Sequence, residues 1–120
     1  MLKTLKAKKQ LKGKSPMTSG NKYQVTIERK DNGKKISFVY HDNYKNESKL
    51  NDFMYAIISD MRAIEYCDTI EDFMKEFGYN SYEEAKKVFN GCKTNGNKLK
   101  SMFTIEEIVT IEEELNELGY

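Results

Sequence analysis

The chain has 120 residues, a formal net charge of +1, two cysteines and no tryptophan. This length fits one domain, and the absence of any apolar run near about 18 residues argues against a membrane span. Despite the small net charge, positive and negative residues are strongly segregated along the chain. Residues 1–22 hold seven lysines and no acid precedes Glu28, whereas no base follows Lys100 and six glutamates do. A basic start favours a polyanionic partner, and an acidic end favours a basic protein surface.

Residues 1–20 are predicted to be a flexible basic arm that precedes a domain of residues 21–120. The arm has few apolar side chains, its second half has the composition of a linker, and a helical stripe of Leu2, Leu5 and Leu11 would be marginal alone. It is either a disordered tail or a segment that orders on nucleic acid. In the second case its lysines would bind phosphates: Lys3, Lys6, Lys8, Lys9, Lys12 and Lys14. Removal of residues 1–16 should then abolish nucleic-acid binding and leave the thermal transition almost unchanged.

Two alternating segments, residues 23–28 and 36–41, predict a β-hairpin. The Asn32-Gly33 pair between them is the preferred centre of a type I′ turn. Closing the chain there pairs Arg29 with Ile36, Ile27 with Phe38 and Val25 with Tyr40. This register gathers the apolar side chains on one face, which helices should cover because a two-stranded sheet is unstable alone. The competing interpretation is that aromatic residues of this face stack on bases: Tyr23, Phe38 and Tyr40.

The rest of the chain is predicted to be helical. Apolar residues spaced by three and four indicate a helix over residues 50–64, capped by Ser48 or Asn51. A short helix should start after Thr69 and end at Gly78. The fold class is therefore α+β, with one antiparallel hairpin packed against about four helices.

Two capping boxes predict the starts of the third and fourth helices, at Ser81 with Glu84 and at Thr104 with Glu107. In the last helix the apolar residues should point inward: Ile108, Ile111, Leu115 and Leu118. Its outer side is acidic, and two stripes follow from the helical spacing, Glu106 with Glu113 and Glu117, and Glu107 with Glu114. This face is either simply solvated or a phosphate-mimicking surface that binds a basic protein.

The residue chemistry offers no catalytic signature. Cys67 and Cys92 match no metal or redox spacing, which predicts reduced thiols in a cytoplasmic protein; the alternative is a structural disulfide, which would need an oxidising compartment. The single histidine, His41, has no nucleophile arranged near it in sequence, so its pairing with a cysteine is only an alternative. Phosphate-binding and dinucleotide-binding glycine motifs are absent. The sequence therefore predicts a protein that is not an enzyme and that uses no metal or cofactor.

Five segments carry a resemblance to a family: residues 23–27, 33–38, 57–60, 71–79 and 103–108. The most distinctive is Glu-Asp-Phe-Met-Lys-Glu-Phe-Gly-Tyr, followed later by Phe-Thr-Ile-Glu-Glu. Over residues 21–118 the chain resembles small proteins encoded by prophages and mobile elements of low-GC Gram-positive bacteria. These resemble other small phage accessory proteins, among which anti-CRISPR inhibitors are prominent, and they have no established catalytic motif. The basic arm departs from their usual pattern.

The resemblance implies a phage or mobile-element accessory protein that acts by binding in the cytoplasm of a bacterial host. Its expected target is a Cas9-type nuclease or the guide-RNA complex of that nuclease, which holds nucleic acid in a positively charged channel. The acidic last helix would compete there, while the lysine arm would hold guide RNA or DNA. The alternative is a nucleic-acid-binding accessory protein of the phage life cycle. An inhibitor of another host enzyme is not distinguished from these, and the oligomeric state is not predicted.

Overall fold

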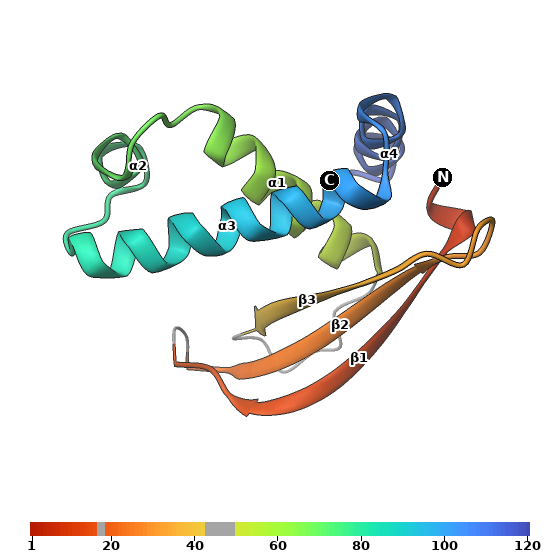
Figure 1. The fold of residues 1–120 in the computed structure, drawn as a ribbon, viewed down its shortest axis with the longest axis horizontal. Helices are drawn as coiled ribbons and strands as arrows, with labels where there is room; N and C mark the ends of the chain where they lie inside the picture. Colours follow the sequence, from red (N-terminus) through yellow and green to blue (C-terminus); the bar gives the residue numbers. More distant parts are fainter. Residues whose placement is uncertain (17–18, 43–49) are drawn as a thin grey trace.

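The computed structural model of the chain describes residues 1–16, 19–42 and 50–120. Its elements are, in chain order, η1 (Leu2–Thr4), β1 (Leu5–Lys14), β2 (Asn21–Arg29), β3 (Lys35–Asp42), α1 (Leu50–Glu65), α2 (Ile70–Phe77), α3 (Tyr82–Met102) and α4 (Ile105–Glu117). Within these residues the strands form one antiparallel sheet in the order β1-β2-β3, and the helices lie on one of its faces (Figure 1). The predicted α+β class is confirmed, and β2 with β3 forms the predicted hairpin.

The N-terminal segment is the main difference from the predicted fold, because the flexible basic arm expected for residues 1–20 is not observed. β1 instead pairs with β2 as a third strand. Leu2 and Leu5 are only 9% and 3% exposed and belong to the main core. An edge strand keeps one edge in water, where lysines are tolerated and discourage pairing with other chains. The lysine-rich composition that indicated an arm is therefore equally compatible with an edge strand.

The hairpin of β2 and β3 keeps the predicted faces but not the predicted register. Phe38 lies opposite Val25 rather than Ile27, a shift of two residues. The loop is longer than a type I′ turn, which requires positive φ at both central residues. Of the expected Asn32-Gly33 centre, only Gly33 has it, with φ 73°. Because strand side chains alternate with a period of two, the shift leaves the same residues facing the core.

The main core lies between the sheet and the helices. Val25, Ile27 and Phe38 face the helices and are at most 2% exposed. They pack with apolar residues of α1, α4 and the end of α3, and Tyr40 meets Phe53 edge-on with 4.9 Å between the ring centroids. Burial of each such side chain stabilises the fold by about 1.5–3 kcal/mol. The same burial leaves Phe38 no surface for stacking on bases, whereas Tyr23 and Tyr40 are only partly buried against this core.

The first two helices follow their local signals. α1 matches the helix predicted over residues 50–64, although Asn51 lies inside its first turn and Ser48 is outside the described residues. At α2 the Thr69 side chain accepts a hydrogen bond from a backbone N–H of the first turn. The helix ends at Gly78, whose φ of 74° is left-handed, a conformation that glycine adopts without steric cost.

The last two helices begin where predicted. At α3 only one of the two bonds of the expected box is formed, from the Glu84 N–H to Ser81 Oγ at 3.3 Å. At α4 both bonds between Thr104 and Glu107 are present. Leu118, which was expected to point inward, is 59% exposed because it lies just beyond the end of α4.

Candidate nucleic-acid interface

The sheet has one face on which none of the described helices lies (Figure 1). Side chains of a strand alternate between faces, so the two registers place every second residue there. This outer sheet face consists of Lys6, Lys8, Gln10, Lys22, Gln24, Thr26, Glu28, Lys35, Ser37, Val39 and His41. Four lysines against one glutamate give it a net charge of +3. The face is therefore polar and basic, and it has no tyrosine or phenylalanine side chain.

The single acid of the outer sheet face is already neutralised by its neighbours. Glu28 lies between Lys6 and Lys35 in one row across the sheet, with Nζ to carboxylate distances of 3.2 and 3.3 Å. The hydrogen bond from Lys6, followed by that from Lys35, lowers the pKa of Glu28. In the next row the hydroxyl oxygens of Thr26 and Ser37 are 2.9 Å apart. These contacts align the side chains without removing the excess of positive charge.

A contact between a serine and a histidine lies on the outer sheet face at the C-terminal end of β3. The Ser15 hydroxyl lies 2.8 Å from His41 Nδ1, and the Ser15 N–H donates to the Gly20 carbonyl at 3.0 Å. Burial, and then the charge of Lys22, lowers the pKa of His41. The imidazole is therefore neutral at physiological pH, and the positive charge of this face comes from its lysines.

The six lysines predicted to bind nucleic acid do not form one patch. Lys6 and Lys8 lie on the outer sheet face. The others are dispersed: Lys3 in η1, Lys9 over the Tyr23 ring, Lys12 at a β-bulge and Lys14 at the end of β1. Lys22 and Lys35, which sequence reasoning did not select, complete the face. The alternation of the hairpin contained the signal, since both lysines occupy its polar side.

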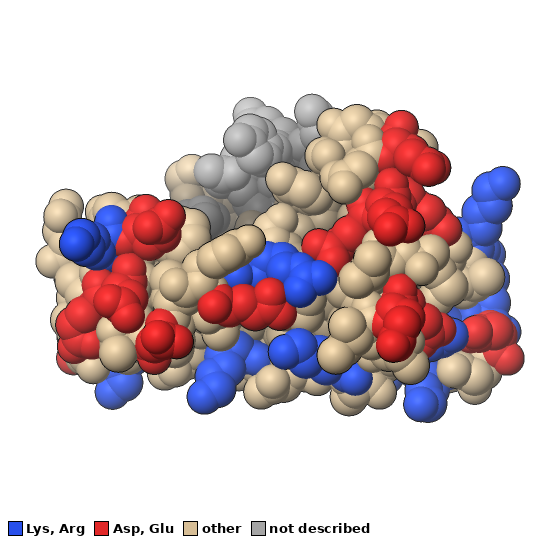
Figure 2. Space-filling model, turned by 90° about the horizontal axis from the view of Figure 1, so that it is seen from above, with Lys and Arg blue, Asp and Glu red and all other residues tan. Residues whose placement is uncertain are grey.

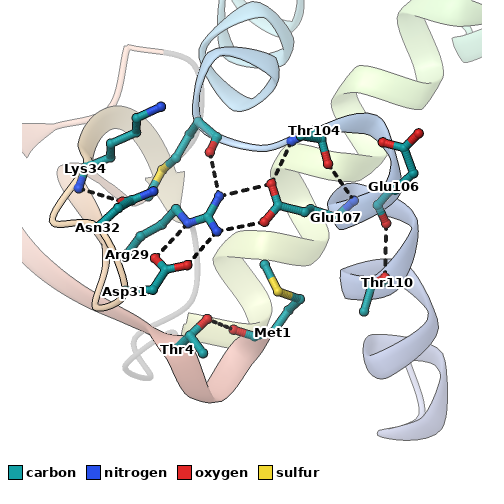
Figure 3. Close-up of polar contacts among 11 residues, drawn as sticks. Met1, Thr4, Arg29, Asp31, Asn32, Lys34, Thr104, Glu106, Glu107 and Thr110 are labelled. Atoms are coloured by element: carbon teal, nitrogen blue, oxygen red, sulfur yellow. Dashed lines mark hydrogen bonds and ion pairs between the residues drawn. The ribbon is translucent and has the colours of Figure 1, made fainter.

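Two of the five glutamates predicted to bind a partner are engaged within the chain. Glu107 accepts two hydrogen bonds from the Arg29 guanidinium, at 2.7 and 3.0 Å (Figure 3). Glu114 accepts one from the Leu2 backbone N–H at 2.9 Å. Arg29 is the main cause of the lowered pKa of Glu107, and the Leu2 N–H is the main cause for Glu114. Both carboxylates therefore contribute to the fold.

The remaining three form what we call the α4 stripe: Glu106, Glu113 and Glu117. All three are exposed, and none forms an ion pair with another described residue. Figure 2 shows acidic side chains gathered over α4 and around α2, with lysine and arginine side chains between them. α4 lies on the helical side of the sheet, away from the outer sheet face (Figure 1). The charge segregation of the sequence is thus also a separation in space.

Metal ligands, membrane-spanning helices and cysteines were also considered in the part of the chain that the structure describes. There, no three His, Cys, Asp or Glu side chains are grouped as the ligands of a metal ion would be. None of the described helices combines the length and the apolar character needed to cross a bilayer. Cys67 and Cys92 are buried free thiols.

The chain was also compared with known proteins. No protein-family model, no curated protein and no solved structure matches it. Its function is therefore inferred from its own residues and their arrangement.

Proposed function

We propose that the protein acts by binding, and that its outer sheet face contacts the phosphate backbone of a nucleic acid. The observation that supports this most directly is the gathering of four lysines on one face with a single, already paired acid: Lys6, Lys8, Lys22 and Lys35. Lysines that neutralise phosphates release condensed counterions, which favours binding at low salt. The polar side chains between them can donate hydrogen bonds to phosphate and sugar oxygens, contacts that carry no sequence information.

The composition of this face also defines the kind of recognition. Sheet-based proteins that bind single strands stack bases on exposed aromatic side chains. The outer sheet face has no tyrosine or phenylalanine, its one ring is that of His41, which contacts Ser15, and the tyrosine and phenylalanine residues of the hairpin lie on its other side. Binding should therefore be salt-sensitive and show little preference among sequences.

The proposal is tested with a triple variant of the full chain, Lys6→Gln, Lys8→Gln and Lys22→Gln. Binding to a labelled DNA duplex and to an RNA of the same sequence is followed by fluorescence anisotropy over a range of salt concentrations. Each lost phosphate contact reduces the slope of log K against log salt by about 1, so the triple variant should lose about 2–3.

A matched control removes the same charge elsewhere, from three exposed lysines of α3: Lys86, Lys93 and Lys100. Changing these three to glutamine should leave most of the affinity and the salt slope intact. If this control loses as much as the variant of the outer sheet face, only net charge matters and the assignment to that face is wrong. If the unchanged protein binds neither nucleic acid at low salt, the proposal fails.

A second candidate is inhibition of a Cas9-type nuclease or its guide-RNA complex by a phage or mobile-element protein. The observation that favours it is the α4 stripe, which is exposed and carries no internal ion pair with a described residue. Such a nuclease has a positively charged channel, which the stripe would occupy by charge complementarity. Because the outer sheet face lies on another side, the same molecule could contact guide RNA or target DNA.

This candidate predicts that DNA cleavage stops at a near-equimolar ratio of protein to nuclease, with nuclease and guide RNA chemically intact. Reversing the three charges of the α4 stripe to lysine should weaken inhibition, because like charges across an interface cost several kcal/mol. The matched control reverses three exposed acids of α2 and α3: Glu71, Glu76 and Glu83. Inhibition far below equimolar ratio would indicate an enzyme instead, and full cleavage at large excess would exclude this candidate.

A further inference from the structure

A second surface feature is a cavity of about 690 Å³ between β3, α1 and α3. Its volume lies within the range of about 300–1,000 Å³ that small-molecule sites occupy. Much of its lining is apolar or aromatic: Val25, Phe38, Tyr40, Phe53, Ile57 and Val88. Ligand sites typically combine such a lining with a few convergent polar groups. The polar groups of this cavity therefore decide what it could bind.

The most informative polar group of the cavity is the carboxyl of Asp60. Burial raises the pKa of Asp60 to about 6, and a hydrogen bond with the Cys92 thiol is the only opposing contribution. At neutral pH the group is therefore mainly a carboxylate that is mostly out of water. Lys87 and Lys98 also line the cavity, but no described cation forms an ion pair with Asp60: Lys98 Nζ donates to the Ser37 carbonyl at 2.9 Å, and Lys87 is exposed. An anion in this position is stabilised by a cationic partner.

The hydrogen bond from Lys98 to the Ser37 carbonyl argues against a peptide as the ligand of this cavity. β3 is an edge strand, and the carbonyl of Ser37 points away from β2, toward the cavity. An added peptide strand would need that carbonyl for pairing, but Lys98 already binds it. The occupant that fits is compact, with one cationic group and an apolar body.

We propose that this cavity binds a small organic cation, whose amine pairs with Asp60 while its apolar or aromatic body packs against Phe53, Ile57 and Val88. The Asp60 carboxylate supplies selectivity for positive charge, and the ring and aliphatic side chains supply the contact area. The cavity shares Val39 and His41 with the outer sheet face but none of the lysines of that face. The proposal does not depend on the function proposed for that face.

The test uses the full chain and two probes that share an aromatic body, tryptamine and its neutral counterpart tryptophol. Amide chemical shifts are followed by NMR during titration near neutral pH. Tryptamine should shift the amide resonances of Tyr40, Ile57 and Cys92. Tryptophol should bind at least about tenfold more weakly than tryptamine. In Asp60→Asn the two probes should bind equally. In Asp68→Asn, which removes an exposed acid outside the cavity, the preference should persist.

A second variant guards against an uninformative result from Asp60→Asn. Val88→Trp places a bulky ring in the cavity and keeps Asp60, and it should abolish the binding of both probes. The proposal is overturned if tryptamine causes no shifts in the cavity up to its solubility limit. It is equally overturned if tryptamine and tryptophol bind the unchanged protein alike, or if the preference for tryptamine survives Asp60→Asn.

Discussion

At the scale of single residues, Arg29 joins parts of the chain that are far apart in sequence. Its side chain is only 9% exposed. It donates to Asp31 in the hairpin loop, to Glu107 at the start of α4, and to the Met102 carbonyl at the end of α3 (Figure 3). A charged side chain can be buried at tolerable cost only when its donors are satisfied in this way. Arg29 therefore fixes how the sheet meets the last two helices.

We predict that Arg29→Met lowers the free energy of unfolding by about 1–3 kcal/mol, measured by urea denaturation near neutral pH. Loss of a fully buried pair costs about 3–5 kcal/mol, but the Glu107 side chain is 27% exposed and water can partly replace the arginine. Because Arg29 lowers the pKa of Glu107, this difference should shrink as the pH falls below the ordinary value of 4.5. As a control, Arg62→Met removes a 33% exposed arginine and should cost less, at most about 1 kcal/mol.

Asp60 should affect the pH dependence of the free energy of unfolding in the direction opposite to Glu107. Burial raises the pKa of Asp60 from 3.8 to about 6, so the folded protein gains stability from this group as the pH falls from about 6 to 3.8. Above that range the partly buried carboxylate destabilises the fold, and Asp60→Asn should raise the free energy of unfolding by up to about 3 kcal/mol. The gain should fade toward about pH 4. Urea denaturation at several pH values checks this, and a gain that does not depend on pH would contradict it.

At the scale of elements, α1 and α3 are in close contact at Gly96. This glycine is buried in the middle of α3, and a Cβ placed on it would lie 3.3 Å from Met61 Cγ in α1. Gly91, on the same helix, is exposed and a Cβ there would meet nothing within 4 Å. The two glycines look alike in the sequence, but only Gly96 is required by packing.

The two positions form a matched pair for mutation to alanine. Gly91→Ala should raise the free energy of unfolding by about 1 kcal/mol, because alanine loses less conformational freedom in a helix. Gly96→Ala gains the same propensity but must displace Met61, and overpacking costs about 1–3 kcal/mol. It should therefore give no net stabilisation in thermal or urea denaturation. Equal gains at both positions would show that the helices do not meet at Gly96.

At the scale of the whole molecule, the N-terminal segment connects the sheet to the last helix. Leu2 and Leu5 lie in the main core, and the Leu2 N–H binds Glu114 of α4. Arg62 of α1 donates a hydrogen bond to Glu112 of α4. α4 is therefore held by polar contacts with both the N-terminal segment and α1. Because of these contacts, we now expect removal of residues 1–16 to destabilise the fold, whereas the sequence predicted almost no change.

We predict that Leu5→Ala lowers the free energy of unfolding by about 2–5 kcal/mol, since it opens a cavity in a well-packed core. Leu11→Ala is a matched control on the same strand and the same face, and Leu11 is 58% exposed. Its effect should stay within about 0.5 kcal/mol. If both variants melt like the unchanged protein, β1 does not contribute to the fold.

The sequence by itself determined the features that depend on neighbours along the chain. The alternation in β2 and β3 identified the hairpin and its two faces, because strand side chains alternate whatever the register. Thr69, Gly78 and the capping box at Thr104 marked helix ends, because caps satisfy backbone groups only a few residues away. The acidic character of the last helix followed from composition and helical spacing alone.

Tertiary structure alone decided the features that depend on residues far apart in the chain. Residues 5–14 pair with the second edge of β2. The alternation of Leu5, Ala7 and Leu11 with lysines is a weak strand signal, and the high lysine content made the segment resemble a solvated tail. The same pairing brings Lys6 and Lys8 beside Lys22 and Lys35 on one face. Of the five acidic residues selected by helical spacing, Glu107 and Glu114 bind partners at the other end of the chain. Contacts between residues so far apart in the chain cannot be predicted from local sequence, because they form and contribute free energy only when the helices and strands pack together.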